Sequence, residues 1–458
     1  MEFVHTPYQP GETIAAVATP PGQGGVAIIR ISGKEAVAIA NKVFSGDVTR
    51  YPSHTVHYGK IHDAAGKQID DVLLVPMLGT RSYTGEDTIE IQCHGGTLIT
   101  RRVLDAVLAA GARAALPGEF TFKAFINGKI DLAQAEAVQE LIGAKNERAL
   151  DAAEEQLQGM LSHKIEGFQK ALVDTAAILE AWVDFPEEGL EFASMEEVCR
   201  HLESVKQEMQ TLVETFHDGR IIHEGVALCL IGSPNVGKSS LMNALLDKDR
   251  AIVSHIPGTT RDIVEDHLRI NGLHIKLIDT AGIRITEEVI EQEGIRRSKE
   301  AMSKANLILF LLDASQPIHP EERALLNTIP KEKCIVVWNK TDLPHSSLES
   351  LQGSHTVEVS AKKRQGLEKL HQAIDRVIWE KGPPSREELL ITNVRHKEAL
   401  VQAITACQAV IDGLRNDVSP ELITMDMRHV LKSLGAIIGK DITEDILSAI
   451  FSKFCIGK

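Results

Sequence analysis

The sequence predicts an α/β domain inserted into a helical domain, with an α+β domain before both. Short β-rich runs alternate with glycine and proline turns from about residue 12 to 115, and apolar residues recur at helical spacing after Asp131. From Gly225 onward, short apolar runs alternate with helix-length segments, and helical spacing resumes after Gly382-Pro383-Pro384. The two helical segments bury their apolar faces best against each other, which makes the second sheet domain an insertion.

The expected elements follow in order. The first domain should contain a helix and four strands, at Thr97–Ala110, Val26–Ile31, Thr55–Ile61, Val72–Met77 and Thr88–Gln92. A turn at Pro186 should interrupt the first helical segment. The inserted domain should form a mainly parallel sheet from Val226–Ile231, Ile275–Ile278, Leu307–Leu312 and Ile335–Trp338. Residues 441–444 should cap a last helix that ends near Phe454. We place the domains at 1–119, 120–219, 220–380 and 381–458.

The composition is that of an acidic globular protein, with 458 residues, a formal net charge of −15 and six cysteines without a CxxC pair. RNA binding would need a partner or the basic clusters at 101–102, 296–299 and 362–364, although such short clusters are more often solvated faces than binding sites. The cysteine usage favours a reducing compartment. No run approaches the roughly 18 apolar residues that span a bilayer, and the N-terminus has no signal-peptide pattern. We therefore expect a cytoplasmic protein without a membrane segment.

Residues 232–239, GSPNVGKS, match the phosphate-binding motif GxxxxGK[ST] between a predicted strand and a helix that begins near Ser240. Backbone N–H groups of such a turn point at phosphate oxygens. Lys238 is then placed to contact the β- and γ-phosphates, and the Ser239 hydroxyl is placed to ligate Mg²⁺. The alternative, an ordinary glycine-rich turn, does not explain the strand and helix on either side.

Asn339-Lys340-Thr341-Asp342 follows the strand Ile335–Trp338, at the order and distance after the phosphate-binding turn that a guanine-specifying loop requires. The Asp342 carboxylate can accept both N1–H and N2–H of guanine, and adenine offers no such donor pair. The stem of Lys340 can lie along the ring, and Ser360-Ala361 matches the loop that contacts the guanine oxygen. The pattern predicts GTP and GDP as ligands.

Two further motifs match the nucleotide-sensing switches of GTPases. Asp279-Thr280-Ala281-Gly282 ends a predicted strand, so Asp279 would hold Mg²⁺ through water and the Gly282 amide would sense the γ-phosphate. The run Gly258–Asp262 matches switch I, in which Thr260 completes the Mg²⁺ shell. Ile283 stands where small GTPases carry a glutamine that orients water, so another group must do that work.

Three segments outside the inserted domain resemble a single family: ATPPGQGGVAIIRISG near the start, PGEFTFKAFINGKIDLAQAEAV after residue 116, and the terminal FCIGK. Together with GSPNVGKSS, IPGTTRD and DTAGIR, they resemble the tRNA-modifying GTPases of the MnmE/TrmE family over nearly the whole chain. The resemblance implies a homodimer in which the first domain is folate-binding-like and mediates dimerisation. With the motifs above, it gives the expected GTP contacts as Asn235, Val236, Gly237, Lys238, Ser239, Ser240, Ser254, His255, Ile256, Pro257, Gly258, Thr259, Thr260, Asp279, Thr280, Ala281, Gly282, Asn339, Lys340, Asp342, Ser360 and Ala361.

The same resemblance implies activation by K⁺, with the cation in the space that an arginine finger would fill. It implies that Glu291 orients the attacking water and so acts in catalysis beside Lys238. The K⁺ ligands would be the side chain of Asn235, the carbonyls of Ser254 and Ile256, and Thr259. The alternatives are that Asn235 only caps a turn and that Glu291 is one acid of the exposed run 287–293.

The resemblance further implies 5-formyl-tetrahydrofolate, or a related folate, bound by Arg30, Glu90, Lys129 and Lys458. Glu90 suits the donor–acceptor edge of the pterin, and Arg30 and the lysines suit the carboxylates of the glutamyl tail. Cys455 would face the folate pocket and take part in the chemistry, or it would be a small packing residue.

The implied function is modification of certain tRNAs at C5 of the wobble uridine, by addition of a carboxymethylaminomethyl or aminomethyl group. An FAD-dependent partner of the MnmG/GidA type, joined in a heterotetramer, would supply the flavin chemistry, since this chain shows no dinucleotide-binding fingerprint. Two other classes remain open. One is a ribosome-assembly GTPase switch that only binds RNA, and the other is a free-standing folate-dependent methyltransferase with a regulatory GTPase domain.

Overall fold

The computed structural model describes residues 11–184, 195–249, 267–270, 272–278, 302, 305–344, 355–379, 382–385, 388–416, 418–440 and 442–457. The chain divides into two compact units. One contains residues 1–142, 154–207 and 399–458, and the other contains residues 143–153 and 208–398. The predicted turn at Pro186 lies outside the described residues.

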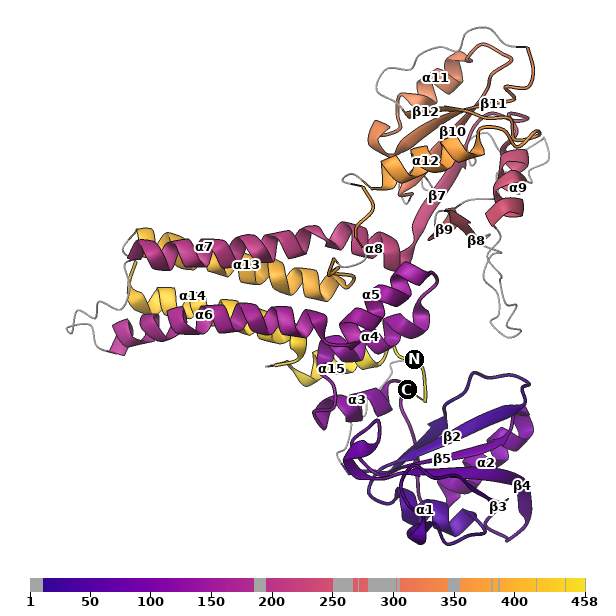
Figure 1. Cartoon of the computed structure of the whole chain (residues 1–458), viewed down its shortest axis with the longest axis vertical. Coiled ribbons are helices and arrows are strands. Elements are labelled where there is room, and N and C mark those ends of the chain that lie inside the picture. The colour runs from indigo at the N-terminus through magenta and orange to yellow at the C-terminus, as the bar shows by residue number, and fades with distance from the viewer. Residues whose placement is uncertain are drawn as a thin grey trace. The chain divides into compact units, whose positions relative to one another are not determined.

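The N-terminal part of the first unit is a six-stranded sheet in the order β3-β4-β5-β2-β1-β6 (Figure 1). All neighbouring strands are antiparallel except β1 and β6. The strands are β1 (Ile14–Val17), β2 (Val26–Ser32), β3 (His57–His62), β4 (Gln68–Met77), β5 (Thr88–His94) and β6 (Arg113–Ala114), with helices α1 (Ala36–Val43) and α2 (Thr97–Ala109) and 3₁₀ turns at Val48–Arg50 and Gly79–Arg81. The four predicted strands and the helix are confirmed, and β1, β6 and α1 were not expected.

The alternation of residues along β2 and β5 separates the two faces of this sheet. Ile29 and Ile31 of β2 and Ile89 and Ile91 of β5 are fully buried and pack with α1 and α2. Because successive side chains of a strand point to opposite faces, Arg30 and the facing residues of β5 lie on the side away from those helices. The functional candidates of the first domain are therefore on the face that α1 and α2 leave uncovered.

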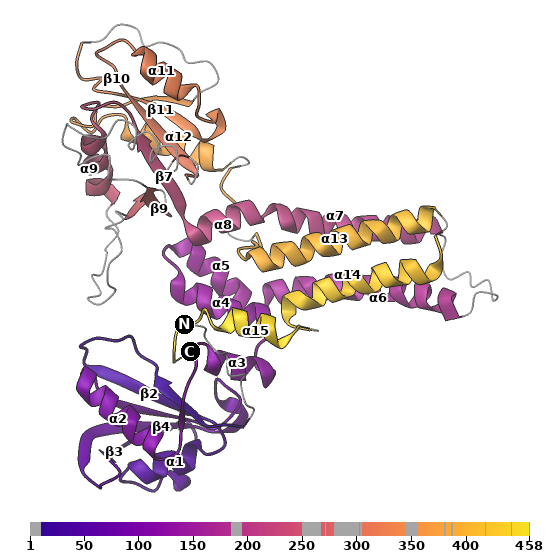
Figure 2. The ribbon, with the colours of Figure 1, turned by 180° about the vertical axis from the view of Figure 1, so that it is seen from behind.

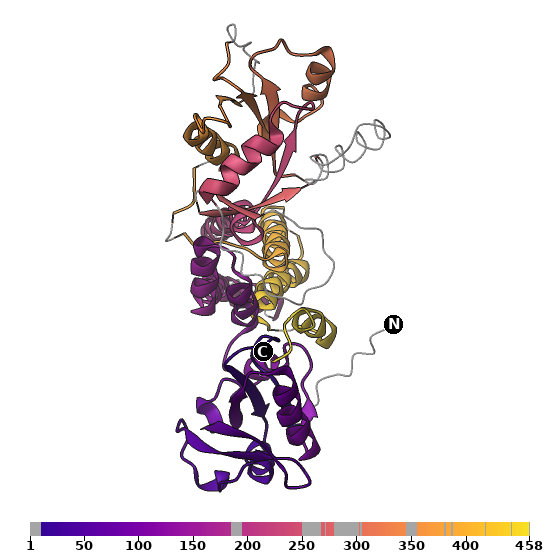
Figure 3. The same ribbon diagram turned by 90° about the vertical axis from the view of Figure 1, so that its right-hand side faces the viewer.

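The helical segments from before and after the inserted domain pack on each other. In Figures 1 and 2, α6 runs beside α14 and α7 beside α13, and Figure 3 views these long helices end-on. The Gln169 side chain donates to the Leu431 carbonyl (3.2 Å), and Lys206 Nζ donates to Gln408 Oε1 (2.6 Å). The helices are α3 (Glu119–Ile126), α4 (Leu132–Gly143), α5 (Glu147–Leu157), α6 (Met160–Asp184), α7 (Met195–Glu214), α8 (Phe216–Glu224), α13 (Val394–Arg415), α14 (Pro420–Ile438) and α15 (Glu444–Phe451). The insertion inferred from helical spacing is confirmed.

The predicted cap of the last helix is described only in part, because Asp441 lies outside the described residues. Thr443 occupies the capping position of α15, but its side chain makes no capping hydrogen bond. Thr443 and Glu444 are both exposed. Water can therefore satisfy the first N–H groups of this helix, and a side-chain cap is not required.

The second unit carries the inserted sheet, in the order β12-β11-β10-β7-β9-β8. Every described strand pair is parallel except β8 with β9, which confirms a mainly parallel sheet. The elements are β7 (Val226–Ile231), α9 (Lys238–Asp249), β8 (His267–Ile270), β9 (Leu273–Ile278), β10 (Leu307–Asp313), α11 (Pro320–Leu326), a 3₁₀ turn at Lys331–Lys333, β11 (Cys334–Asn339), β12 (His355–Glu358) and α12 (Leu367–Ile378). The short strands β8 and β12 were not expected, and α9 begins at Lys238 rather than at Ser240.

Candidate nucleotide-binding site

The phosphate-binding turn joins the end of β7 to the first residue of α9. Its two glycines are required by close approach of the backbone to neighbouring groups. A Cβ atom at Gly232 would lie 2.6 Å from the Leu311 carbonyl oxygen, and one at Gly237, where φ is +99°, would lie 2.2 Å from Asn339 Nδ2. Val236 is buried between them. The turn therefore presents backbone to a ligand, with the buried valine as its anchor.

Lys238 folds back over the turn. Its Nζ donates to the carbonyl oxygens of Gly232 (2.6 Å) and Ser233 (2.9 Å). Burial lowers the pKa of this ammonium group, because desolvation disfavours the charged form. Ser239 and Ser240 are exposed in the first turn of α9. The lysine charge and the N-terminal N–H groups of a helix are thus present at one place, as an anionic phosphate requires.

The side chain of Asn339 forms hydrogen bonds to both the phosphate-binding turn and the Ser360-Ala361 loop. Its side chain is 2% exposed. Its Nδ2 donates to the Val236 carbonyl (2.9 Å), and its Oδ1 accepts from the Ala361 N–H (3.1 Å). The phosphate-binding turn and the Ser360-Ala361 loop are therefore held to the same amide group at the end of β11.

The carboxylate that would read guanine is held by a neighbouring hydroxyl. Ser360 Oγ donates to Asp342 Oδ1 (2.7 Å). This hydrogen bond is the main cause of a lowered Asp342 pKa, which burial opposes and the charges of Lys362 and Lys363 assist. The carboxyl group is thus held in the ionised form that accepts two N–H donors.

Lys340 is paired with a residue that the sequence analysis missed. Its Nζ lies 2.6 Å from Oδ2 of Asp313, at the end of β10, and its own backbone is left-handed with φ of 65°. Burial raises the pKa of Asp313, but hydrogen bonds from Lys340 and Ser315 and the Lys340 charge lower it further, so the net pKa is below the ordinary value. The ion pair fixes the direction of the lysine stem. A signal existed in the sequence, because an aspartate ending a central parallel strand lies at the ligand-binding edge.

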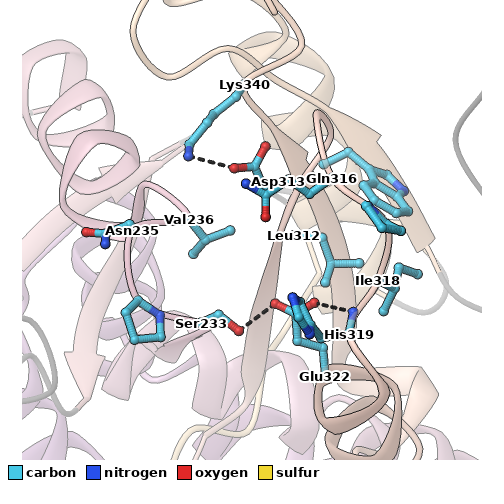
Figure 4. A pocket seen from close by; sticks show the side chains of 13 residues that line it. Ser233, Asn235, Val236, Leu312, Asp313, Gln316, Ile318, His319, Glu322 and Lys340 are labelled. Atoms are coloured by element: carbon cyan, nitrogen blue, oxygen red, sulfur yellow. Dashed lines mark hydrogen bonds and ion pairs between the residues drawn. The ribbon is translucent and has the colours of Figure 1, made fainter. Parts of the chain in front are cut away.

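A pocket of about 190 Å³ lies between the phosphate-binding turn and the β10–α11 connection. Figure 4 shows Ser233 and Val236 on one side of it and Asp313, Leu312 and Glu322 on the other. Ser233 Oγ donates to Glu322 Oε1 (2.5 Å), a contact that the sequence analysis also missed. The two residues are 89 positions apart, so only the fold brings them together.

Asn235, the predicted K⁺ ligand, has a left-handed backbone with φ of 61° and an exposed side chain, and it is one of the residues that line the pocket in Figure 4. Within the part of the chain that the structure describes, no hydrogen bond engages that side chain. Several expected contacts lie outside the described residues: Ser254, His255, Ile256, Pro257, Gly258, Thr259, Thr260, Asp279, Thr280, Ala281, Gly282 and Glu291.

In the first unit, Arg30 and Glu90 face each other across β2 and β5. Arg30 Nη2 lies 2.8 Å from Glu90 Oε1, with side-chain exposures of 22% and 15%. The guanidinium also stands 5.7 Å from the centre of the Phe120 ring and donates to the Gly457 carbonyl (3.4 Å). Since the two groups are in contact, they would meet the same part of a bound ligand, which does not fit the expected division between the pterin edge for Glu90 and the tail carboxylates for Arg30.

The other described residues expected at the folate site form their hydrogen bonds elsewhere than at the Arg30–Glu90 pair. Lys129 Nζ donates to the Thr80 carbonyl (2.7 Å). Cys455 has an exposed side chain, and its carbonyl accepts from Gly118 N–H (3.3 Å), so the backbone of the C-terminal segment is attached to the first domain. Lys458 lies outside the described residues.

A glycine-rich turn between a parallel strand and a helix, with a guanine-type loop two strands away in the same sheet, defines a P-loop GTPase domain inserted into a helical domain. Family models agree with the flanking parts. The model described as "GTP-binding protein TrmE N-terminus" matches residues 13–129, and the one described as "MnmE helical domain" matches residues 132–455.

Curated relatives match over the whole length. The chain is 65% identical to a tRNA modification GTPase MnmE of Protochlamydia amoebophila, with 100% of both chains covered. It is 43% identical to a tRNA modification GTPase MnmE of Geobacter metallireducens, with 98% of this chain and 99% of the relative covered. Among solved structures, the G domain of the T. maritima FeoB iron transporter is 28% identical over 34% of this chain and 99% of that chain, with a TM-score of 0.26.

The chain belongs to the MnmE family of tRNA modification GTPases. Its enzymatic activity is accordingly GTP hydrolysis in tRNA modification. Over the described residues, no helix combines the length and the apolar character needed to cross a membrane.

Proposed function

We propose that this chain is a Mg²⁺-dependent, K⁺-activated GTPase that acts with an FAD-dependent partner on C5 of the wobble uridine of certain tRNAs. The group added would be carboxymethylaminomethyl or aminomethyl, with the one-carbon unit taken from a folate. The observation that carries the nucleotide part is the Asn339 bridge between Val236 and Ala361, because it holds the phosphate-binding turn and the Ser360-Ala361 loop to one side chain. Ser239 and Thr260 would hold Mg²⁺, and Lys238 would contact the phosphates.

The K⁺ assignment rests on the available side chain of Asn235. The alternative, that this side chain caps the turn, finds no support, since no capping hydrogen bond to a described residue is present. A cation held by Asn235 with Ser254, Ile256 and Thr259 would place positive charge where phosphate charge develops, and Glu291 would orient water.

GTP turnover in a series of alkali cations tests this assignment. We expect K⁺ and Rb⁺, which have similar radii, to stimulate turnover and Na⁺ to leave it low. Asn235→Ala should abolish the stimulation while GDP binding is retained, since Lys238 and Asp342 are unchanged. Equal rates in Na⁺ and K⁺ would refute K⁺ activation.

The folate assignment rests on the Arg30–Glu90 pair, which is partly accessible on the sheet face away from α1 and α2. Arg30, Glu90, Lys129 and Lys458 would bind the folate, and the exposed Cys455 thiol would lie on the same C-terminal segment. Titration calorimetry with 5-formyl-tetrahydrofolate tests it. Glu90→Gln should weaken binding strongly, whereas Glu35→Gln, an exposed change beside α1, should not. Equal affinity of both variants would contradict the assignment.

The cellular role is tested by nucleoside analysis of tRNA from cells that lack this chain. Loss of the modified wobble uridine is expected, together with co-purification of a flavoprotein in a heterotetramer with the homodimer. An unchanged tRNA profile with co-purification of ribosomal subunits would instead favour a ribosome-assembly GTPase. The six free cysteines support our assignment to the reducing cytoplasm.

A further inference from the structure

One side of the phosphate-binding turn is attached to a helix that carries none of the nucleotide motifs. The carboxylate of Glu322, in the first turn of α11, accepts from Ser233 Oγ (2.5 Å) with one oxygen and from the His319 backbone N–H (3.0 Å) with the other. The His319 side chain in turn accepts from the Glu322 backbone, which completes a capping box, and Pro320 begins the helix.

The cap makes Glu322 a fixed anchor for the turn. Its carboxylate is oriented by the α11 backbone, so the hydrogen bond to Ser233 restrains the loop relative to the helix. A hydroxyl that donates to an ionised carboxylate forms a charge-assisted bond, which is stronger than a neutral one. The position of Ser233 is therefore set by a rigid neighbour.

Ser233 in turn holds the phosphate-binding lysine. Its backbone carbonyl accepts from Lys238 Nζ (2.9 Å), beside the Gly232 carbonyl at 2.6 Å. The path from Glu322 through Ser233 to Lys238 consists of two direct hydrogen bonds. Figure 4 shows the first of them across the pocket wall.

We infer that Glu322 is a positioning residue for nucleotide binding, which acts through Ser233 to keep the phosphate-binding turn and Lys238 in a binding-competent arrangement. The inference rests on the proposed contact of Lys238 with the phosphates. Because these bonds restrain the turn, their loss should raise the ordering required on binding and so weaken affinity for GDP and GTP alike. The rate of hydrolysis at saturating GTP should change little, because the bound phosphates themselves hold Lys238 in place and Glu322 does not touch the reacting atoms.

A double-mutant cycle in the full-length protein tests the inference, with Ser233→Ala, Glu322→Ala and the double variant. We expect each single change to weaken binding of a fluorescent GDP analogue about tenfold, equivalent to about 1.4 kcal/mol. The double variant should bind no more weakly than Glu322→Ala, and all variants should keep kcat within about twofold while KM rises. Glu321→Gln, an exposed neighbour in the same turn, is the matched control and should bind like the unaltered protein.

Two further variants distinguish failure of the positioning role of Glu322 from failure of the proposed nucleotide site. Glu322→Gln keeps the α11 cap and a neutral hydrogen bond to Ser233, so it should recover part of the affinity lost in Glu322→Ala. Lys238→Ala should abolish binding, and retained binding would overturn the proposed site itself. If Lys238→Ala abolishes binding but Ser233→Ala binds normally, or if the single effects simply add, the positioning role of Glu322 is overturned while the proposed site stands.

Discussion

Replacement of Asn339 tests whether the guanine and phosphate loops depend on one buried amide. In Asn339→Ala, the Val236 carbonyl loses its donor at 2.9 Å and the Ala361 N–H loses its acceptor at 3.1 Å. Asn339→Asp is nearly the same size and keeps the acceptor for Ala361. It replaces the donor with an oxygen that faces the Val236 carbonyl oxygen, and it adds a negative charge at a site that is 2% exposed.

The expected loss of GDP affinity follows from the two backbone groups that lose their partners, the Val236 carbonyl and the Ala361 N–H. A buried donor or acceptor without a partner costs about 1–3 kcal/mol, so two cost about 2–6 kcal/mol if water does not reach them. Nucleotide loops lie near the surface, and water should therefore hold the loss near the lower limit. We expect GDP affinity to fall about 30-fold in Asn339→Ala, which is about 2 kcal/mol. Asn339→Asp should lose at least as much, because it adds repulsion to the lost bond.

Fluorescence titration with a GDP analogue measures both losses, and circular dichroism checks that the sheet is retained. Thr356→Ala, on the exposed surface of β12, is a suitable control that should bind normally. The reasoning is refuted if Asn339→Asp binds as tightly as the unaltered protein, since the donor to Val236 would then have no importance.

Three further predictions concern charges and thiols elsewhere in the chain. Asp313→Asn should weaken GDP binding by releasing Lys340. In the unaltered protein the pKa of Asp313 is lowered, so the ion pair stabilises the domain above pH 3.8, the ordinary pKa of an aspartate, and this stabilisation is lost as the pH falls through the folded-state pKa. Acid unfolding of the two proteins would measure the difference. Lys123→Met should destabilise the first domain by about 3–5 kcal/mol in urea unfolding, because the fully buried ammonium is removed from Glu86 at 2.8 Å. Native protein should react with one equivalent of a thiol reagent, at the exposed Cys455, and unfolded protein with six.

The sequence located the nucleotide loops because their residue types have few alternatives. Gly232 and Gly237 approach other groups so closely that only glycine fits, and this requirement is visible in the motif. Arg30 and Glu90 were identified singly by resemblance, but their contact depends on the register of β2 against β5, which no local pattern sets.

The contacts that were missed depend on strand order. Asp313 reaches Lys340 because β10 lies between β7 and β11, and the order of strands in a sheet is not written in hydrophobic periodicity. The unexpected strands β1, β8 and β12 have four residues each, too few for alternation to distinguish them from turns. Prediction succeeded where local chemistry decides and failed where distant segments meet.

Three hydrogen-bonded contacts restrain the nucleotide loops, and mutation of such contacts should have different kinetic effects from mutation of a residue that acts in the transition state. Asn339 joins two loops, Asp313 orients Lys340, and Glu322 holds Ser233, each through a hydrogen bond between protein groups. These bonds restrain the loops and do not involve the reacting atoms, so the loss of one of them should appear in Kd and KM. A group that acts only on charge developing in the transition state, as proposed for a cation at Asn235, should instead appear in kcat. If Asn235→Ala raised KM and left kcat unchanged, Asn235 would restrain the loops, as Asn339, Asp313 and Glu322 do, and would not be a ligand of an activating cation.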